Sequence, residues 1–166
     1  MMSKHQTQSI ILLLDNVRSA HNVGSIFRTA EGVGVEKIYC LCTTPVPIDR
    51  FGRKRKDLAK VALGAEDLIK WERIEDENKM LELVRKLQKD GWKVVALEQA
   101  DNAVNYSDVK PAQKMLVIVG NEVGGISAEL LKVADTVAEI PMRGMKESLN
   151  VSVATGVFLY CISQGL

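Results

Sequence analysis

Residues 115–127 read MLVIVGNEVGGIS, a short apolar run that breaks into a turn rich in glycine. A short apolar run bounded by glycine is typical of a strand that is buried on both faces of a sheet. Gly120, Gly124 and Gly125 leave the backbone after this strand free to make a tight turn that a Cβ would obstruct. We therefore expect a buried strand at Met115–Val119 and a ligand against the turn that follows it.

This turn departs from a phosphate-binding P-loop at the positions that contact phosphate. The spacing Gly120-x-x-x-x-Gly125-Ile126-Ser127 places an isoleucine where a P-loop carries its lysine. Glu122 adds a carboxylate where phosphate oxygens would lie. The sequence thus disfavours a polyphosphate ligand. A nucleotide-binding enzyme that uses a variant P-loop remains an alternative hypothesis.

The segments on both sides of the turn predict an α/β fold. Further apolar runs, each expected to form a strand, lie at Ser9–Leu14, Glu36–Cys42, Trp92–Leu97 and Thr136–Ile140. Helices are expected from Asn22 to Gly32 or Gly34, and at Lys54–Leu63, Asp76–Asp90, Ser127–Val133 and from Ser148 or Leu149 to Gln164. The segment that ends at Trp71 is expected to be irregular or briefly extended. Apolar strands that alternate with helices favour a mostly parallel sheet with helices on both faces, in a single domain over residues 1–166.

Length and cysteine usage point to an intracellular protein with one core. A chain of 166 residues is long enough to bury a core that needs no disulfide or metal. Cys40, Cys42 and Cys161 lie in apolar segments without CxxC pairing, which indicates thiols in a reducing compartment. The first segment has only five apolar residues before Asp15, too few for a signal peptide or a membrane span. We expect a cytoplasmic protein with no metal and no membrane partner.

The chain carries a net charge of only +1, but its positive charge is concentrated locally. Six cations fall within eleven residues: Arg50, Arg53, Lys54, Arg55, Lys56 and Lys60. Such a run is either a solvated loop that leads into a solvated helix face or a contact surface for nucleic-acid phosphates.

Three polar clusters remain after the packing residues are set aside. They are Asn22 with Arg28, the turn at residues 120–125, and the segment Ile140–Asn150. Ligands in open α/β sheets bind outside the carboxyl ends of strands, so clusters at such ends can converge on one pocket. Taken singly, Asn22 has the pattern of a helix N-cap and Arg28 that of a solvated surface arginine. The chain lacks GxGxxG, GxSxG and HExxH, which disfavours dinucleotide, hydrolase and zinc chemistry.

In their order along the chain, the three clusters resemble the three motifs of the SpoU/TrmH family of RNA ribose 2′-O-methyltransferases, within the SPOUT superfamily. NVGSIFRTA at Asn22–Ala30 is similar to the first motif, with its asparagine and arginine six residues apart. IVGNEVGGI at Ile118–Ile126 is similar to the second, and IPMRGMKESLNVS at Ile140–Ser152 to the third.

The resemblance implies a deep trefoil knot in the C-terminal third, S-adenosylmethionine as cofactor, tRNA or rRNA as substrate and a homodimer with active sites at the interface. Carried over by position, it implies cofactor contacts from Leu97, Gly120, Asn121, Ile140, Met142, Ser148 and Leu149. It also implies that Arg28 is catalytic and that the residues which orient it and fix the loops are Asn22, Glu122, Ser148 and Asn150.

Two further expectations concern the surface. The RNA backbone is expected to contact Arg18, Arg53, Lys54 and Arg55. The last helix is apolar nearly all round, which predicts burial on more than one side and favours a subunit interface. Charged substitutions at Val157 or Phe158 are then expected to give monomer or unfolded protein. A noncatalytic RNA-binding or assembly protein that keeps the same fold remains the alternative from a different class.

Overall fold

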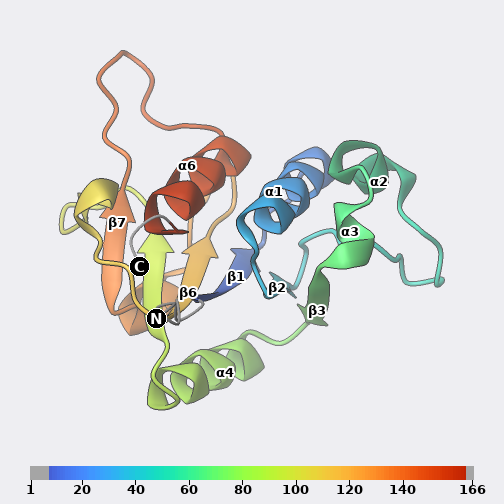
Figure 1. Cartoon of the computed structure of the whole chain (residues 1–166), viewed down its shortest axis with the longest axis horizontal. Coiled ribbons are helices and arrows are strands. Elements are labelled where there is room, and N and C mark those ends of the chain that lie inside the picture. Colours follow the sequence, from blue (N-terminus) through green and yellow to red (C-terminus); the bar gives the residue numbers. More distant parts are fainter. Residues whose placement is uncertain (1–7, 164–166) are drawn as a thin grey trace, which may run out of the picture.

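A parallel sheet of seven strands runs through the molecule, in the order β3-β2-β1-β6-β4-β7-β5 (Figure 1). The computed structural model describes residues 8–163, so His5 and the predicted helix end at Gln164 lie outside the described residues. The strands are β1 (Ser9–Asp15), β2 (Lys37–Leu41), β3 (Lys70–Ile74), β4 (Lys93–Leu97), β5 (Val104–Asn105), β6 (Lys114–Val119) and β7 (Thr136–Glu139). The predicted α/β fold with a mostly parallel sheet is confirmed.

Helices cover both faces of this sheet, as the apolar strands predicted. One face carries α1 (Ala20–Val33), α2 (Lys56–Ala62), α3 (Ala65–Leu68) and α6 (Val151–Ser163). The other face carries α4 (Glu77–Lys89) and α5 (Ala128–Val133), and a short 3-10 helix, η1 (Tyr106–Asp108), follows β5. In Figure 1 the first group lies above the sheet and α4 lies below it. No helix within residues 8–163 is both long and apolar enough to cross a membrane.

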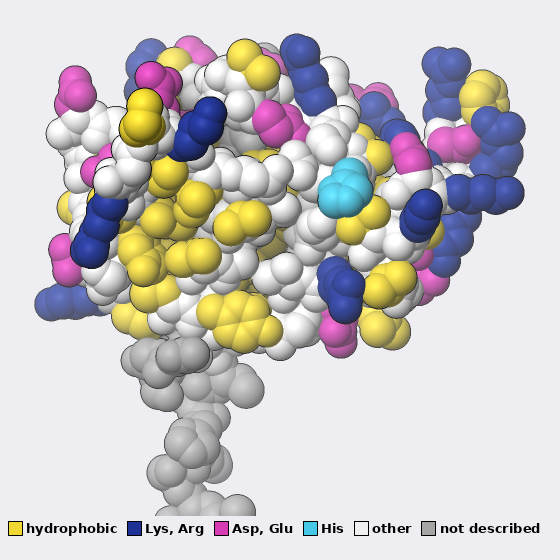
Figure 2. Space-filling model, turned by 90° about the horizontal axis from the view of Figure 1, so that it is seen from above, with side chains coloured by type: hydrophobic (Ala, Val, Ile, Leu, Met, Phe, Trp, Pro, Cys, Tyr) yellow, Lys and Arg dark blue, Asp and Glu magenta, His cyan; other side chains and the backbone are white. Residues whose placement is uncertain are grey.

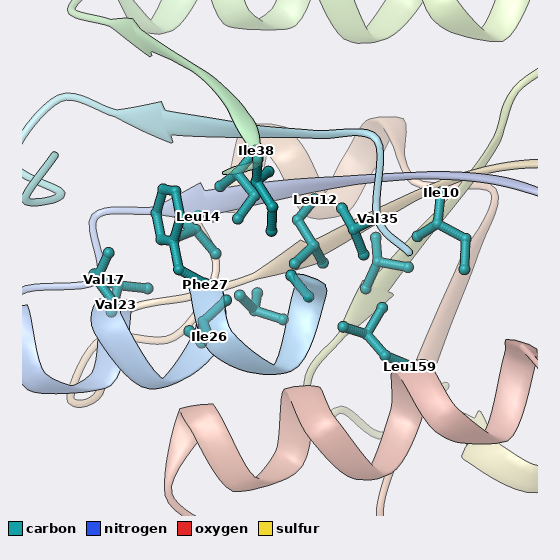
Figure 3. Packing of buried hydrophobic residues seen from close by; sticks show 14 of the residues in the cluster. Ile10, Leu12, Leu14, Val17, Val23, Ile26, Phe27, Val35, Ile38 and Leu159 are labelled. Carbon is teal, nitrogen blue, oxygen red and sulfur yellow. The ribbon is translucent and has the colours of Figure 1, made fainter. Parts of the chain in front are cut away.

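Alternate residues of β1 explain why this strand is apolar throughout. Leu12 and Leu14 pack toward α1 and α6, where Phe27 and Leu159 are completely buried (Figure 3). Leu13, their neighbour in sequence, points to the opposite cluster beneath α4. Each such buried side chain stabilises the fold by roughly 1.5–3 kcal/mol. The central strands are thus fixed by two cores, and their carboxyl ends lie along one edge of the sheet.

The first helix begins earlier than its sequence pattern predicted. Ser19, not Asn22, is the N-cap: its Oγ accepts the N–H of Asn22 at 3.2 Å, and the helix starts at Ala20. Asn22 therefore lies in the first helical turn, where its side chain is buried but free to bond elsewhere. The last helix starts later than predicted, at Val151, because Asn150 Oδ1 accepts the N–H of Ser152 at 2.9 Å.

Two edge strands were not predicted as members of the sheet, because their sequences are polar. The segment up to Trp71, which was expected to be irregular or briefly extended, contains α3 and leads into β3, which pairs with β2 and is largely exposed. β5 has only two residues, both exposed, and is defined by its pairing with β7. Exposed edge strands bury little apolar surface, so hydrophobic periodicity does not reveal them.

Candidate active site

A cavity of about 460 Å³ opens at the carboxyl ends of β4, β6 and β7. Its walls are the ends of these strands, the turn after β6 and the start of α6. The predicted cofactor residues that line it are Leu97, Gly120, Asn121, Ile140, Ser148 and Leu149. Met142 is not among the lining residues, although it lies in the loop between β7 and α6.

Glu122 joins the first predicted motif to the second. Its carboxylate accepts the side-chain N–H of Asn22 at 3.0 Å and the backbone N–H groups of Arg18 and Ser19, each at 3.1 Å. These donors belong to the first turn of α1 and the residues just before it. Glu122 therefore ties the N-terminus of α1 to the mouth of the cavity.

The third motif closes the same network. Asn150 Nδ2 donates to Asn22 Oδ1 at 3.1 Å, while Asn22 Nδ2 donates to Glu122. Asn22 thus lies between the other two residues, which are 100 and 128 positions further along the chain. Three predicted catalytic residues meet in one hydrogen-bonded row, and Ser148 lines the cavity beside them.

The surroundings of Glu122 hold it in the ionised form. Burial by itself would raise the pKa of this carboxyl, but the hydrogen bonds from the Asn22 amide and the nearby backbone N–H groups outweigh it, so the pKa is lowered. Glu122 is therefore a carboxylate at neutral pH and remains an acceptor for all three donors.

Two more carboxylates fix the turn after β6, and the sequence interpretation did not include them. Asp15 Oδ2 accepts the N–H of Ser127 at 2.7 Å, and Glu98 Oε2 accepts the N–H of Ile126 at 2.8 Å. Asp15 is 2% exposed. Both acids directly follow an apolar run, β1 or β4, and that position was the available signal.

Asn121 shapes the turn from inside. Its Oδ1 accepts the N–H groups of Val123 and Gly124 at 2.8 and 2.9 Å, and its Nδ2 donates to the carbonyl of Asn16 at 2.8 Å. Gly125 has a φ of +68°, and a Cβ there would strike the Glu98 carboxylate. Glycine is therefore favoured at position 125 by its conformation and because a side chain would displace the Glu98 carboxylate.

The cavity is lined by negative charge. Carboxylates come from Glu98, Glu122, Glu139 and Glu147, and no lysine or arginine is among the described lining residues. A cavity of this composition repels phosphate and suits a ligand that carries positive charge. The arrangement argues against the variant P-loop.

Arg28 lies apart from the network in the single chain. It is exposed on α1, it is not among the residues that line the cavity, and within residues 8–163 it makes no hydrogen bond or ion pair. Its neighbour Thr29 faces Gly156 of α6, where an added Cβ would meet Thr29 Cγ2 at 3.4 Å. Gly32, one helical turn beyond Arg28 on the same side of α1, faces Tyr160 of α6, where an added Cβ would meet Tyr160 Oη at 3.3 Å. Arg28 is thus a free cation near the border between α1 and α6.

The predicted RNA-contacting cations are mostly paired with acids. Arg53 pairs with Asp49 at 3.0 Å, and Arg55 pairs with Asp57 at 2.6 Å. Lys54 pairs with two carboxylates of α3, the buried Glu66 at 3.0 Å and the exposed Asp67 at 2.6 Å. These pairs anchor the loop between β2 and α2. The side chain of Arg18 is exposed, and only its backbone N–H enters the cavity network.

Residues 8–163 contain no group of three histidine, cysteine or acidic side chains that would hold a metal ion.

Known proteins resemble this chain in both sequence and structure. A tRNA (guanosine(18)-2′-O)-methyltransferase from Aquifex aeolicus is 34% identical over 92% of this chain and 68% of its own length. A 23S rRNA (guanosine-2′-O-)-methyltransferase from Coxiella burnetii is 31% identical over 96% of this chain and 60% of its own length. The S-adenosylmethionine-bound crystal structure of an rRNA methyltransferase from Sinorhizobium meliloti is 29% identical and superposes with a TM-score of 0.82, over 95% of this chain and 57% of that one. The profile of the SpoU rRNA methylase family matches residues 9–160. The chain belongs to the SpoU rRNA methylase family, as its three motifs predicted.

Proposed function

We propose that this chain transfers the methyl group of S-adenosylmethionine to a ribose 2′-hydroxyl of tRNA or rRNA. One observation carries the proposal: the three family motifs meet at one cavity, where Asn150, Asn22 and Glu122 form a continuous hydrogen-bonded row. The relatives named as guanosine 2′-O-methyltransferases of tRNA and rRNA support the reaction class.

The cavity residues fit S-adenosylmethionine. This cofactor carries a sulfonium and an ammonium group, which suit walls that contain Glu98, Glu122, Glu139 and Glu147 and no cation among the described residues. Leu97, Ile140 and Leu149 offer an apolar surface for an adenine ring. When bound, the cofactor supplies an electrophilic methyl carbon. The protein orients the ribose oxygen against that carbon and excludes competing water, so that proximity contributes much of the rate.

Arg28 is the residue that we assign to the substrate RNA. A guanidinium keeps its proton at neutral pH and is a poor base, so the proposed role of Arg28 is to hold the adjacent RNA phosphate and stabilise negative charge on the 2′-oxygen. Its freedom from any acid partner within residues 8–163 leaves the guanidinium available for that contact. Asn22, Glu122 and Asn150 hold the loops in place.

We infer that two copies of the chain form a homodimer through α6. Phe158 and Leu159 on one side of this helix are buried in the core, but Val153, Val157 and Tyr160 remain 38–51% exposed. Figure 2 shows hydrophobic side chains gathered on the face of the molecule that carries α6. Arg28 borders this surface, so dimerisation would bring it close to the cavity of the partner subunit.

Val157 and Phe158, the two positions at which the sequence suggested a test of the dimer, differ in burial. Phe158 is fully buried, so a charged substitution there would unfold the protein. Val157→Glu is the informative variant, because it changes an exposed face. Light scattering is expected to show a dimer for the wild type and a folded monomer for Val157→Glu. A wild type that is monomeric at micromolar concentration would contradict the dimer.

We further propose that residues 1–166 form one catalytic domain with a deep trefoil knot, and that the protein acts in the cytoplasm. The family likeness supports the knot. The chain path is compatible with it, since β7 lies between β4 and β5 and the long loop after β7 returns to the cavity at the start of α6 (Figure 1).

The test of the function is transfer of labelled methyl groups to bulk tRNA and rRNA, followed by nuclease digestion and mass spectrometry of the nucleosides. We expect 2′-O-methylnucleosides with the wild type and a loss of about a hundredfold or more with Arg28→Ala, the scale of one charge-stabilising contact in a transition state. Arg85→Ala is the matched control, because Arg85 is an exposed arginine on α4, on the other face of the sheet. An Arg28→Ala protein as active as wild type would refute the assigned role. RNA binding without any methyl transfer would favour the noncatalytic alternative.

A further inference from the structure

The loop between β2 and α2 presents an exposed phenylalanine that neither core cluster uses. Phe51 is 66% exposed and lies at the tip of the turn Asp49–Arg53. Arginine and lysine side chains gather at the projecting end of the molecule in Figure 2, and the sequence places Arg50 and Arg53 on either side of Phe51. A large aromatic ring in water among cations contributes little to the stability of the fold.

The turn that carries Phe51 is rigidly built. Asp49 Oδ1 accepts the N–H groups of Phe51 and Arg53 at 2.8 and 2.9 Å, and the N–H of Asp49 donates to the Arg53 carbonyl at 2.8 Å. Gly52 supplies the left-handed conformation that the turn needs, with a φ of +76°. A single isolated bridge between Ile48 and Lys54 closes the base of the turn. The backbone that carries the ring is therefore fixed before any ligand arrives.

Two guanidinium groups flank the ring. The guanidinium carbons of Arg50 and Arg53 each lie 4.9 Å from the centroid of Phe51. Arg53 is already neutralised by Asp49, whereas Arg50 has no acid partner within residues 8–163. Aromatic rings and guanidinium planes are the surfaces on which unpaired nucleotide bases stack, and a free cation beside them attracts the phosphate.

A second cavity adjoins the ring. It measures about 310 Å³, and its described lining residues are Thr43, Thr44, Pro45, Val46, Asp49, Arg50, Phe51, Arg55 and Arg73. Three arginines and one acid line it, whereas carboxylates line the cavity at the ends of β4 and β6. Arg55 is paired with Asp57 and Arg73 with Glu75, so Arg50 is the arginine of this lining without an acid partner among the described residues. An unpaired guanidinium at this cavity suits a phosphate, and the Thr43 hydroxyl, which donates to Asn16 Oδ1 at 2.8 Å, forms part of the wall.

We propose that Phe51 and Arg50 form a stacking platform for one unpaired base of the substrate RNA, with the neighbouring phosphate in the arginine-lined cavity. The proposal rests on the proposed function and narrows its substrate to RNA that offers a base outside a continuous duplex. Bases within a duplex present no free face for stacking on Phe51.

Binding of bulk tRNA, measured by fluorescence anisotropy without S-adenosylmethionine, tests the platform with four variants. Phe51→Ala and Phe51→Leu are each expected to weaken binding about tenfold, because both remove the stacking face. Phe51→Trp is expected to bind at least as tightly as wild type. Leu68→Ala is the matched control: Leu68 is 72% exposed on α3, and its loss is expected to change nothing.

The dependence of RNA affinity on salt concentration distinguishes a stacking contact from a phosphate contact. Phe51→Leu is expected to leave the slope of log affinity against log salt unchanged, because stacking releases no counterions. Arg50→Gln is expected to reduce that slope by about one. A fully paired RNA duplex is expected to bind Phe51→Leu and wild type equally well.

The outcomes distinguish the platform from the proposed function. Methyl transfer by wild type with an unchanged KM for tRNA in Phe51→Ala would overturn the platform and leave the function intact. If Phe51→Ala binds tRNA more weakly, Phe51→Trp binds it as tightly as wild type, and wild type transfers no methyl group, the platform is supported and the proposed function is overturned. Equal weakening by Leu68→Ala, a change of oligomeric state in Phe51→Ala, or no RNA binding by wild type would each overturn the platform.

Discussion

The cavity at the carboxyl ends of β4 and β6 and the arm at residues 48–55 use the same hydrogen bond in opposite ways. In both regions a carboxylate accepts backbone N–H groups and fixes a turn: Glu122 at the cavity and Asp49 on the arm. At the cavity, acids also line the ligand space, and no cation joins them among the described residues. On the arm Asp49 is the one acid among the described residues that line the second cavity, and two arginines lie beside Phe51. Residue type alone therefore does not show whether a carboxylate fixes the backbone or contacts a ligand. Its position in the fold does.

The largest expected effect is at the cavity, from Glu122→Ala. The substitution removes the acceptor of three N–H groups, of which only the donor from Asn22 belongs to a buried residue, and a buried donor without its partner costs roughly 1–3 kcal/mol. We expect methyl transfer to fall by about a hundredfold, a loss of ~2.7 kcal/mol in transition-state stabilisation. Initial rates of transfer to tRNA measure this change. Glu129→Ala on the exposed surface of α5 is the control, and an equal loss there would contradict a specific role for Glu122.

Salt is expected to separate the two regions. If the arm contributes about three phosphate contacts, RNA affinity falls ~40-fold between 50 and 200 mM salt. S-adenosylmethionine affinity, measured by calorimetry, is expected to change little over the same range, because its cavity is enclosed by the fixed carboxylates. RNA affinity that does not depend on salt would show that the arm makes no phosphate contacts.

A pair of glycines tests how tightly each turn is packed. Gly125 and Gly52 both have positive φ, but an added Cβ meets Glu98 only at Gly125, while at Gly52 nothing lies within 4 Å. Gly125→Ala is expected to weaken S-adenosylmethionine binding about tenfold, a loss of ~1.4 kcal/mol.

Gly52→Ala is expected to lower the free energy of unfolding by ~1 kcal/mol, because alanine is strained in the left-handed conformation. The affinity for S-adenosylmethionine is expected to stay the same. Calorimetry and thermal melts of the two variants give the comparison. Equal cofactor affinities in both would indicate that the turn after β6 adapts to a side chain.

The smallest expected effect is on stability at low pH. The pKa of Glu122 is lowered from 4.5 because hydrogen bonds outweigh burial, and the pKa of Asp49 is lowered from 3.8, chiefly by the backbone N–H of Arg53. A lowered pKa stabilises the fold above the unfolded-state value and loses that contribution as pH falls through the folded-state value. We therefore expect no change in the stability contributed by either carboxylate between pH 7 and pH 5.

Melting temperatures of wild type, Glu122→Gln and Asp49→Asn between pH 6 and 3 test this expectation. The advantage of wild type over Glu122→Gln should shrink below pH 4.5, and the advantage over Asp49→Asn only below about pH 3.8. An advantage over Glu122→Gln that persists unchanged to pH 3 would contradict the role of Glu122 as a charged acceptor.

Much of the cavity was predictable because its residues follow apolar strands. The runs that became β1, β4 and β6 end at Asp15, Leu97 and Val119, and parallel strands bring their carboxyl ends to one edge. The partners of those residues were not predictable. Asn22 has the local pattern of an N-cap, but Ser19 takes that position, and only the approach of Glu122 and Asn150 gives its amide another use.

The sequence by itself determined the parallel α/β sheet, the order of the strand-end motifs and the glycine turn, because apolar periodicity and glycine conformation act over a few neighbouring residues. The tertiary structure decided that Glu122 bonds Asn22 across 100 positions, that Phe158 is core while Val157 is surface, and that Asp49 holds Phe51 among arginines. Those facts depend on how separate elements pack. No single stretch of chain specifies such packing, since each contact needs a partner that another stretch supplies.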